Sequence, residues 1–121
     1  MNYRILVVDD EADVRTFITA VLRKRGYETL TAADGREAFT IAERERPDLI
    51  ILDLAMPNQS GTDFFRKLSK DSDLSGIPVI VVSGLAGRHL AVRKPFAVFD
   101  KPIDPDTFGE TVDRALGAAE E

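Results

Sequence analysis

Apolar residues are spaced along this chain in two alternating ways. Short continuous apolar runs are typical of buried strands, and repeats at intervals of three and four residues are typical of one helix face. Apolar runs predict strands at 5–8, 28–32, 49–54, 78–82 and 98–99. Helical repeats predict helices at about 14–22, 34–46, 62–69 and 105–116. The segment 84–96, after the fourth predicted strand, is the least regular part of the chain.

Breakers and capping residues set the ends of these predicted helices. Asp34 and Asp104 stand where a side-chain cap is favoured, and Pro105 fits the first turn of the last helix. Pro47 requires the second helix to end before it. In the first helix, five apolar residues share one face that we expect to be buried: Val14, Phe17, Ile18, Val21 and Leu22.

Strands that alternate with helices in this way predict an α/β fold with a parallel sheet and helices on both faces. The length of 121 residues suits one domain, so we expect a single domain over 1–121. Right-handed connections would bring the C-terminal ends of all the strands to one edge of the sheet. Open α/β sheets place their ligands and their chemistry at that edge.

Composition excludes several classes of protein. The net charge of −5 argues against direct nucleic-acid binding, which favours a basic patch. The absence of cysteine excludes a disulfide framework and a thiolate metal site. No apolar run approaches the roughly 18 residues of a membrane helix, and the N-terminus lacks the long apolar region of a secretory signal. We therefore expect a cytoplasmic protein without membrane insertion.

Side chains at the ends of four predicted strands could form one site. Asp9 and Asp10 follow the first strand, Asp53 ends the third, Ser83 ends the fourth and Lys101 follows the fifth. Two carboxylates about 4 Å apart repel by about 4 kcal/mol at an effective dielectric near 20. A Mg²⁺ ion relieves such repulsion because it takes oxygen ligands. The chemistry alone favours Asp10 and Asp53 as direct ligands, with Asp9 beside them or bound through water.

These residues also suit phosphoryl transfer. Asp53 is a possible nucleophile, Ser83 a hydrogen-bond donor and Lys101 a compact positive charge. Each residue has an ordinary alternative: Asp9 and Asp10 as a helix cap, Asp53 as a solvated strand end, Ser83 in a turn and Lys101 on the surface. The combination favours a phosphoryl-transfer site. The lone His89, in the irregular segment, is expected to be exposed rather than to bind metal.

Over its whole length the chain resembles a receiver domain of a two-component response regulator, of the single-domain, chemotaxis-regulator-like kind. The resemblance rests on Ile5–Asp10, on Leu52–Pro57 with Gly61, on Val81–Ser83 and on Lys101–Pro102. It implies a flavodoxin-like, doubly wound, five-stranded parallel sheet of order 2-1-3-4-5. The fourth helix, within 84–96, would be short or irregular.

The resemblance also implies roles for the site residues. Asp53 would accept a phosphoryl group from a phosphohistidine of a sensor histidine kinase or a histidine phosphotransfer protein. Asp9 and Asp10 would bind Mg²⁺, helped by Asp53 and the backbone carbonyl of Ala55. Such a protein is not an enzyme in the usual sense, because it catalyses only its own phosphoryl transfer and autodephosphorylation. It signals through contacts with an output protein, which the sequence does not identify.

At the remaining positions, Ser83 takes the place of the family's Thr/Ser switch residue and Lys101 that of its invariant lysine. The Lys101–Pro102 peptide bond is usually cis in such domains. Ala55 and Leu85 occupy the positions that commonly flank the attacking water. Because neither side chain can hydrogen-bond that water, we expect a fairly long-lived phosphoryl group.

Two departures from the family pattern concern signal output. Val98 stands where the family often has an aromatic switch residue. The segment between Ser83 and Lys101 is shorter than usual by about one helical turn, and Lys94–Pro95 would break a helix there. We expect phosphorylation to reorder 84–96, which with Val98 and the last helix would present a partner surface. A loop that never orders is the alternative.

Three other functions are weaker matches to the sequence. A constitutive interaction module would not need the complete set of site residues. A metal-dependent phosphatase with an aspartyl nucleophile usually has an acid two positions after it, and this chain has Ala55 there. Flavin binding would favour a Ser/Thr/Gly loop after the first strand, where this chain has Asp9 and Asp10.

Overall fold

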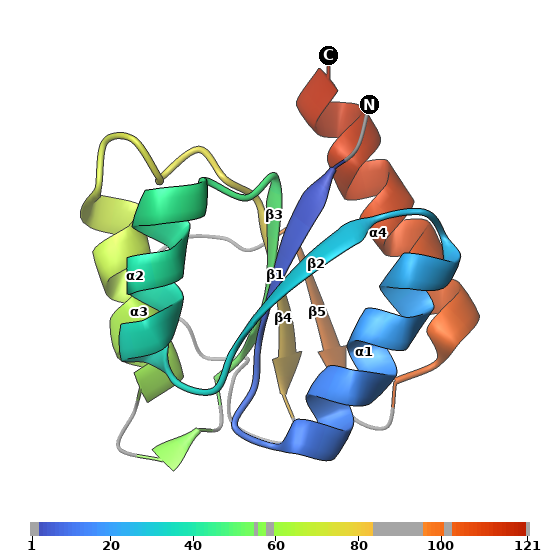
Figure 1. The fold of residues 1–121 in the computed structure, drawn as a ribbon. Coiled ribbons are helices and arrows are strands. Elements are labelled where there is room, and N and C mark those ends of the chain that lie inside the picture. Colours follow the sequence, from blue (N-terminus) through green and yellow to red (C-terminus); the bar gives the residue numbers. More distant parts are fainter. Residues whose placement is uncertain (1–2, 55, 58–59, 84–95, 101–102, 121) are drawn as a thin grey trace.

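A central sheet separates two layers of helices in the computed structural model (Figure 1). The structure describes residues 3–54, 56–57, 60–83, 96–100 and 103–120. Helices α2 and α3 cover one face of the sheet, and α1 and α4 cover the other. The elements are β1 (Arg4–Val8), α1 (Ala12–Lys24), β2 (Glu28–Ala32), α2 (Gly35–Glu45), β3 (Leu49–Asp53), α3 (Ser60–Lys70), β4 (Val79–Ser83), β5 (Ala97–Asp100) and α4 (Pro105–Glu120).

The sheet has five parallel strands in the order β2-β1-β3-β4-β5, which confirms the predicted topology. The register aligns the strand ends. Val8 pairs with Leu52, Asp53 with Val82, and Ser83 with Asp100. The C-terminal ends of β1, β3, β4 and β5 therefore meet at one edge of the sheet.

The central strands are buried on both faces, because their side chains alternate between two apolar cores. On β1, Leu6 and Val8 face the core beneath α2 and α3, which includes Phe64. Ile5 and Val7 face the core beneath α1 and α4, where Phe108 packs. This two-sided burial explains why the strands appear in the sequence as continuous apolar runs.

Both predicted caps are present. The Asp34 carboxylate accepts a hydrogen bond from the Glu37 amide at 2.8 Å, and the Asp104 carboxylate accepts one from the Thr107 amide at 2.9 Å. Hydrogen bonds from the side chain and the backbone of Thr107 hold the pKa of Asp104 below its usual value. Helix α2 ends at Glu45, before Pro47, as predicted.

The expected burial of Phe17 is wrong. Helix α1 buries Ile18 and Leu22, whereas Phe17 is 42% exposed. Phe17 lines a groove of about 490 Å³ between α1 and the start of α4, with Pro105 among its neighbours. Helical spacing identified the apolar stripe, but Phe17 faces this groove rather than the core.

Three further observations concern helices. A short or irregular helix was expected within 84–96, before the helix labelled α4. That segment lies outside the described residues, apart from Phe96. Helix α3 begins at Ser60, two residues before the predicted start. No helix in the part of the chain that the structure describes has the length and apolar character needed to cross a bilayer.

Candidate functional site

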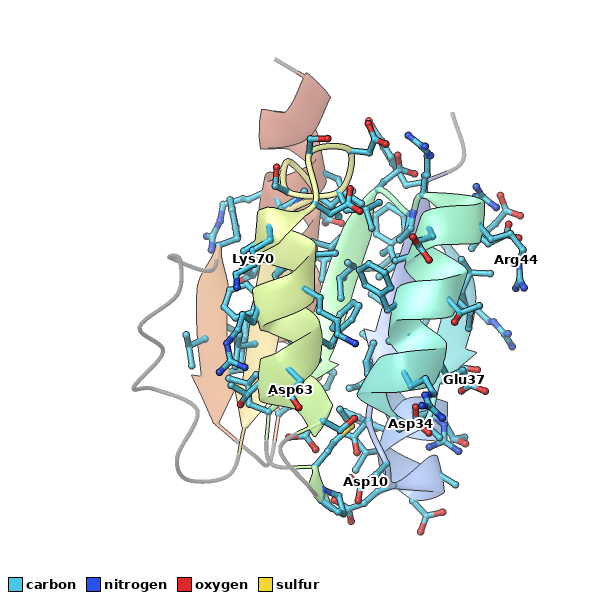
Figure 2. The ribbon with its side chains drawn as sticks, turned by 90° about the vertical axis from the view of Figure 1, so that its left-hand side faces the viewer. Asp10, Asp34, Glu37, Arg44, Asp63 and Lys70 are labelled. Carbon is cyan, nitrogen blue, oxygen red and sulfur yellow. The ribbon has the colours of Figure 1, made fainter. Side chains whose placement is uncertain are left out.

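The structure brings three of the predicted site residues together. Asp9, Asp10 and Asp53 each offer a carboxylate oxygen, and these oxygens all lie within 4.8 Å of one another. Asp9 is 1% exposed and Asp53 is 2% exposed, whereas Asp10 is exposed. The cluster lies at the C-terminal edge of the sheet, and Asp10 is seen there beyond the first turns of α2 and α3 (Figure 2). The cluster therefore combines two buried acids with one that faces solvent.

Asp9 is fixed by its local hydrogen bonds. Its carboxylate accepts a hydrogen bond from the Glu11 amide at 2.9 Å, and its carbonyl accepts one from the Arg15 guanidinium at 2.6 Å. Its own amide donates to the Ala32 carbonyl at 3.2 Å, across to the end of β2. These contacts orient Asp9 toward the cluster.

The alternative role of Asp9 and Asp10 as a simple helix cap is not supported. Helix α1 begins at Ala12, and its N-cap residue is Glu11, so neither aspartate occupies the capping position. A capping carboxylate would accept from an amide in the first helical turn. The Asp9 carboxylate instead accepts from the amide of the N-cap residue itself.

Asp53 is positioned by its strand. It is the last residue of β3, which lies between β1 and β4, and it pairs with Val82. A strand held on both sides fixes its end more firmly than a loop does. Asp53 is thus presented at the sheet edge by rigid backbone, with its carboxylate buried beside the other two acids.

The donor set fits a hard divalent cation. Ligands that share one octahedral Mg²⁺ lie about 3 to 4 Å apart, given metal–oxygen distances near 2 Å. The carboxylate oxygens here are within 4.8 Å, so a small movement or a bridging water brings them into that range. Three carboxylates so close together repel one another, and a cation bound between them offsets that repulsion.

Of the other predicted site residues, the structure describes only the backbone of Ser83. Ser83 ends β4 at the same sheet edge as Asp53, since Val82 pairs with Asp53. The side chain of Ser83 lies outside the described residues, as do Ala55, Lys101 and the Lys101–Pro102 bond that was expected to be cis. Leu85 and His89 are outside them as well.

A groove that the sequence did not predict adjoins the acids. It measures about 660 Å³ and extends from Asp10 along the first turns of α2 and α3, with Asp34 and Asp63 on opposite sides (Figure 2). Ser60 lines it and accepts a hydrogen bond from the Gly35 amide. The only advance indication was the pair of glycines, Gly35 and Gly61, near the starts of these helices.

Comparison with known proteins places this geometry in a family. The family model described as "Response regulator receiver domain" matches residues 5–113. Protein Rrf1 of Nitratidesulfovibrio vulgaris is 34% identical over 116 residues, which cover 96% of this chain and 84% of that protein. Protein PilH of Pseudomonas aeruginosa is 33% identical over 120 residues, which cover 93% of this chain and 97% of PilH.

Solved structures agree with the sequence matches. The receiver domain of the sensor histidine kinase PA1611 from Pseudomonas aeruginosa superposes with a TM-score of 0.87 at 27% identity, covering 97% of this chain and 99% of that domain. That structure has a magnesium ion coordinated in its active-site cleft. The match over most of the chain leaves the phosphatase and flavin-binding alternatives without support. This chain belongs to the response regulator receiver domains, and it is a phosphorylation-dependent signalling receiver of two-component systems.

Proposed function

We propose that Asp53 is the phosphoacceptor and that the donor is a phosphohistidine of a sensor histidine kinase or a histidine phosphotransfer protein. The observation that carries this proposal is the position of Asp53, at the end of a central strand and within 4.8 Å of two other carboxylate ligands. In the transfer, an Asp53 carboxylate oxygen forms a bond to phosphorus while the phosphorus–nitrogen bond breaks. The histidine imidazole leaves with the electron pair and takes a proton from solvent.

The same acids would hold Mg²⁺. Asp9, Asp10 and Asp53 provide carboxylate oxygens, and the backbone carbonyl of Ala55 would complete the protein ligands. The bound ion supplies positive charge that offsets the charge of the carboxylates and of the incoming phosphoryl group. The hydrogen bonds from Glu11 and Arg15 support this role, because they hold Asp9 in a fixed orientation.

Ser83 and Lys101 would bind the transferred group. The Ser83 hydroxyl donates a hydrogen bond to one phosphoryl oxygen, and the Lys101 ammonium pairs with another. The position of Ser83 at the end of β4, next to the strand that ends in Asp53, supports its part. For Lys101 the support is the Lys101–Pro102 motif of the sequence.

The remainder of the proposal concerns the whole protein. Residues 1–121 form one receiver domain that catalyses only its own phosphoryl transfer and autodephosphorylation. It works in the cytoplasm, where it meets its kinase, and it acts on an output protein without inserting into a membrane. The net charge of −5 supports an output through protein contacts rather than through direct binding of nucleic acid.

Intact mass spectrometry tests the proposal. The protein is incubated with acetyl phosphate and MgCl₂, and the wild type should gain the mass of one phosphoryl group. The gain should disappear in Asp53→Asn and in the wild type treated with EDTA. A wild type that gains no mass would favour the constitutive interaction module, and full phosphorylation of Asp53→Asn would refute the choice of acceptor.

A further inference from the structure

The first turns of α2 and α3 are joined by a side-chain hydrogen bond. Gly35 begins α2, and its amide donates to the hydroxyl oxygen of Ser60, the first residue of α3. The first amides of a helix have no partner within that helix. Gly35 is buried, so Ser60 provides the acceptor that its amide needs.

The two helix starts are also in close backbone contact. A Cβ atom on Gly35 would lie well inside 3.0 Å of the Ser60 carbonyl oxygen. Real Cβ atoms essentially never approach backbone atoms so closely, so position 35 accepts only glycine without a shift of α3. The contact between α2 and α3 at this point is therefore tight enough to transmit a displacement.

The next residue of α3 contacts the phosphoacceptor. A Cβ atom on Gly61 would lie well inside 3.0 Å of the Asp53 carbonyl oxygen. The start of α3 thus rests directly on the backbone of Asp53. Any movement of Ser60 and Gly61 relative to the sheet therefore changes their contact with the backbone of Asp53.

A second contact links the same junction to the other buried acid. The Asp9 amide donates to the carbonyl of Ala32, the last residue of β2, which stands three positions before Gly35. The Gly35–Ser60 hydrogen bond therefore lies between two contacts with the acids. On one side the Ala32 carbonyl holds the Asp9 amide, and on the other side Gly61 packs against the Asp53 backbone. Asp10 and Ser60 moreover line the same groove.

We propose that Ser60 is a positioning residue of the phosphoryl-transfer site. Its hydroxyl holds the first turn of α2 against the first turn of α3, and this junction sets the spacing of the Asp53 carboxylate from Asp9 and Asp10. The inference rests on the proposed function of the three acids. It assigns to Ser60 no contact with the metal or with the phosphoryl group.

The test compares two serine substitutions on one helix. Ser60→Ala removes the acceptor of the Gly35 amide, whereas Ser69→Ala removes a hydroxyl that donates to the Phe65 carbonyl of its own helix, at 2.9 Å. Mg²⁺ affinity is measured by calorimetry and the initial rate of phosphorylation by intact mass. We expect about tenfold weaker Mg²⁺ binding and a slower rate in Ser60→Ala, as for loss of groups that orient metal ligands. Ser69→Ala should match the wild type.

Further measurements separate positioning from stability. Amide exchange at Gly35 should accelerate in Ser60→Ala, and Ser60→Thr, which keeps the hydroxyl, should restore Mg²⁺ affinity. If Ser60→Ala does not fold, Ser60→Cys, with a weak acceptor of similar size, should show an intermediate affinity.

Two outcomes would overturn the inference in different ways. Wild-type Mg²⁺ affinity and rate in the folded Ser60 variants, with only the urea midpoint lowered, would show that Ser60 is merely structural. A wild-type chain that neither binds Mg²⁺ nor gains a phosphoryl group would overturn the proposed function, and the positioning role with it.

Discussion

The Tyr27 hydroxyl donates a hydrogen bond to the Asp113 carboxylate, and this bond ties the residue just before β2 to α4 across 86 positions of sequence. Asp113 also forms an ion pair with Arg25, which follows α1. Burial of Tyr27, followed by the hydrogen bond and the negative charge of Asp113, raises the pKa of Tyr27 to about 12, against a smaller opposite effect of Arg25. One carboxylate thereby joins three elements on the α1–α4 side of the sheet.

This contact predicts a loss of stability at alkaline pH. Because the pKa of Tyr27 is higher in the folded chain than its ordinary value of 10, the folded chain retains a proton that the unfolded chain loses. The contribution to the free energy of unfolding is complete below pH 10 and is lost as the pH rises to about 12. Urea unfolding of the wild type and of Tyr27→Phe should differ by about 1 kcal/mol at neutral pH, and the difference should shrink above pH 10. A constant difference would contradict the assignment.

Substitution of Asp53 should stabilise the metal-free protein. Asp53→Asn removes one of three clustered carboxylates, and the relief of repulsion should raise the free energy of unfolding by about 1–3 kcal/mol in EDTA. Saturating Mg²⁺ should reduce this advantage, because the wild type then gains stability by binding the ion. Urea titrations with and without Mg²⁺ measure both effects. Equal stability of the two proteins in EDTA would mean that the acids do not repel one another appreciably.

Mg²⁺ binding should depend on Asp10. Asp10→Ala is expected to weaken binding at least tenfold, because it removes a charged ligand and leaves only the two buried acids. Asp13→Ala is the matched control, since Asp13 is also acidic and exposed but lies in the first turn of α1. Calorimetric titration distinguishes them. If both variants bind like the wild type, the cluster is not a metal site.

The phosphoryl group on Asp53 should be long-lived. Ala55 and Leu85 lack side-chain hydrogen-bonding groups for the attacking water, which leaves that water poorly oriented. After removal of acetyl phosphate, the extra mass should persist far beyond a few seconds. Ala55→Asn, which supplies a polar side chain, should shorten its lifetime. Loss of the wild-type phosphoryl group within seconds, without a partner, would contradict the prediction.

Phosphorylation is expected to alter the segment 84–96. Phe96, at the end of this segment, is 41% exposed, and Val98, in the strand that follows, is 43% exposed, so both present apolar surface to solvent. Amide exchange is measured with and without a phosphoryl mimic on Asp53, and protection across 84–96 should rise when the mimic is bound. Equal protection in both states would support the alternative of a loop that does not order.

The sequence predicted the strands and the meeting of the acids for a physical reason. In a parallel sheet every strand points to one edge, so residues that end β1 and β3 must meet there, whatever their separation in sequence. Periodicity could not show that Phe17 faces a groove rather than the core, because that depends on where α4 begins. The contact between Gly35 and Ser60 depends on how closely α2 and α3 pack together. No local sequence pattern encodes the distance between two helices.

The division of the β-strand side chains between two cores constrains the length of β3. Adding or removing one residue before Asp53 would exchange the two sets of side chains along the strand. It would also put an apolar neighbour, Leu52 or Leu54, at the strand end where the acid now stands. Side chains within β3 can change by a methyl group at modest cost, but its length cannot change by even one residue without disturbing the acid site and both cores together.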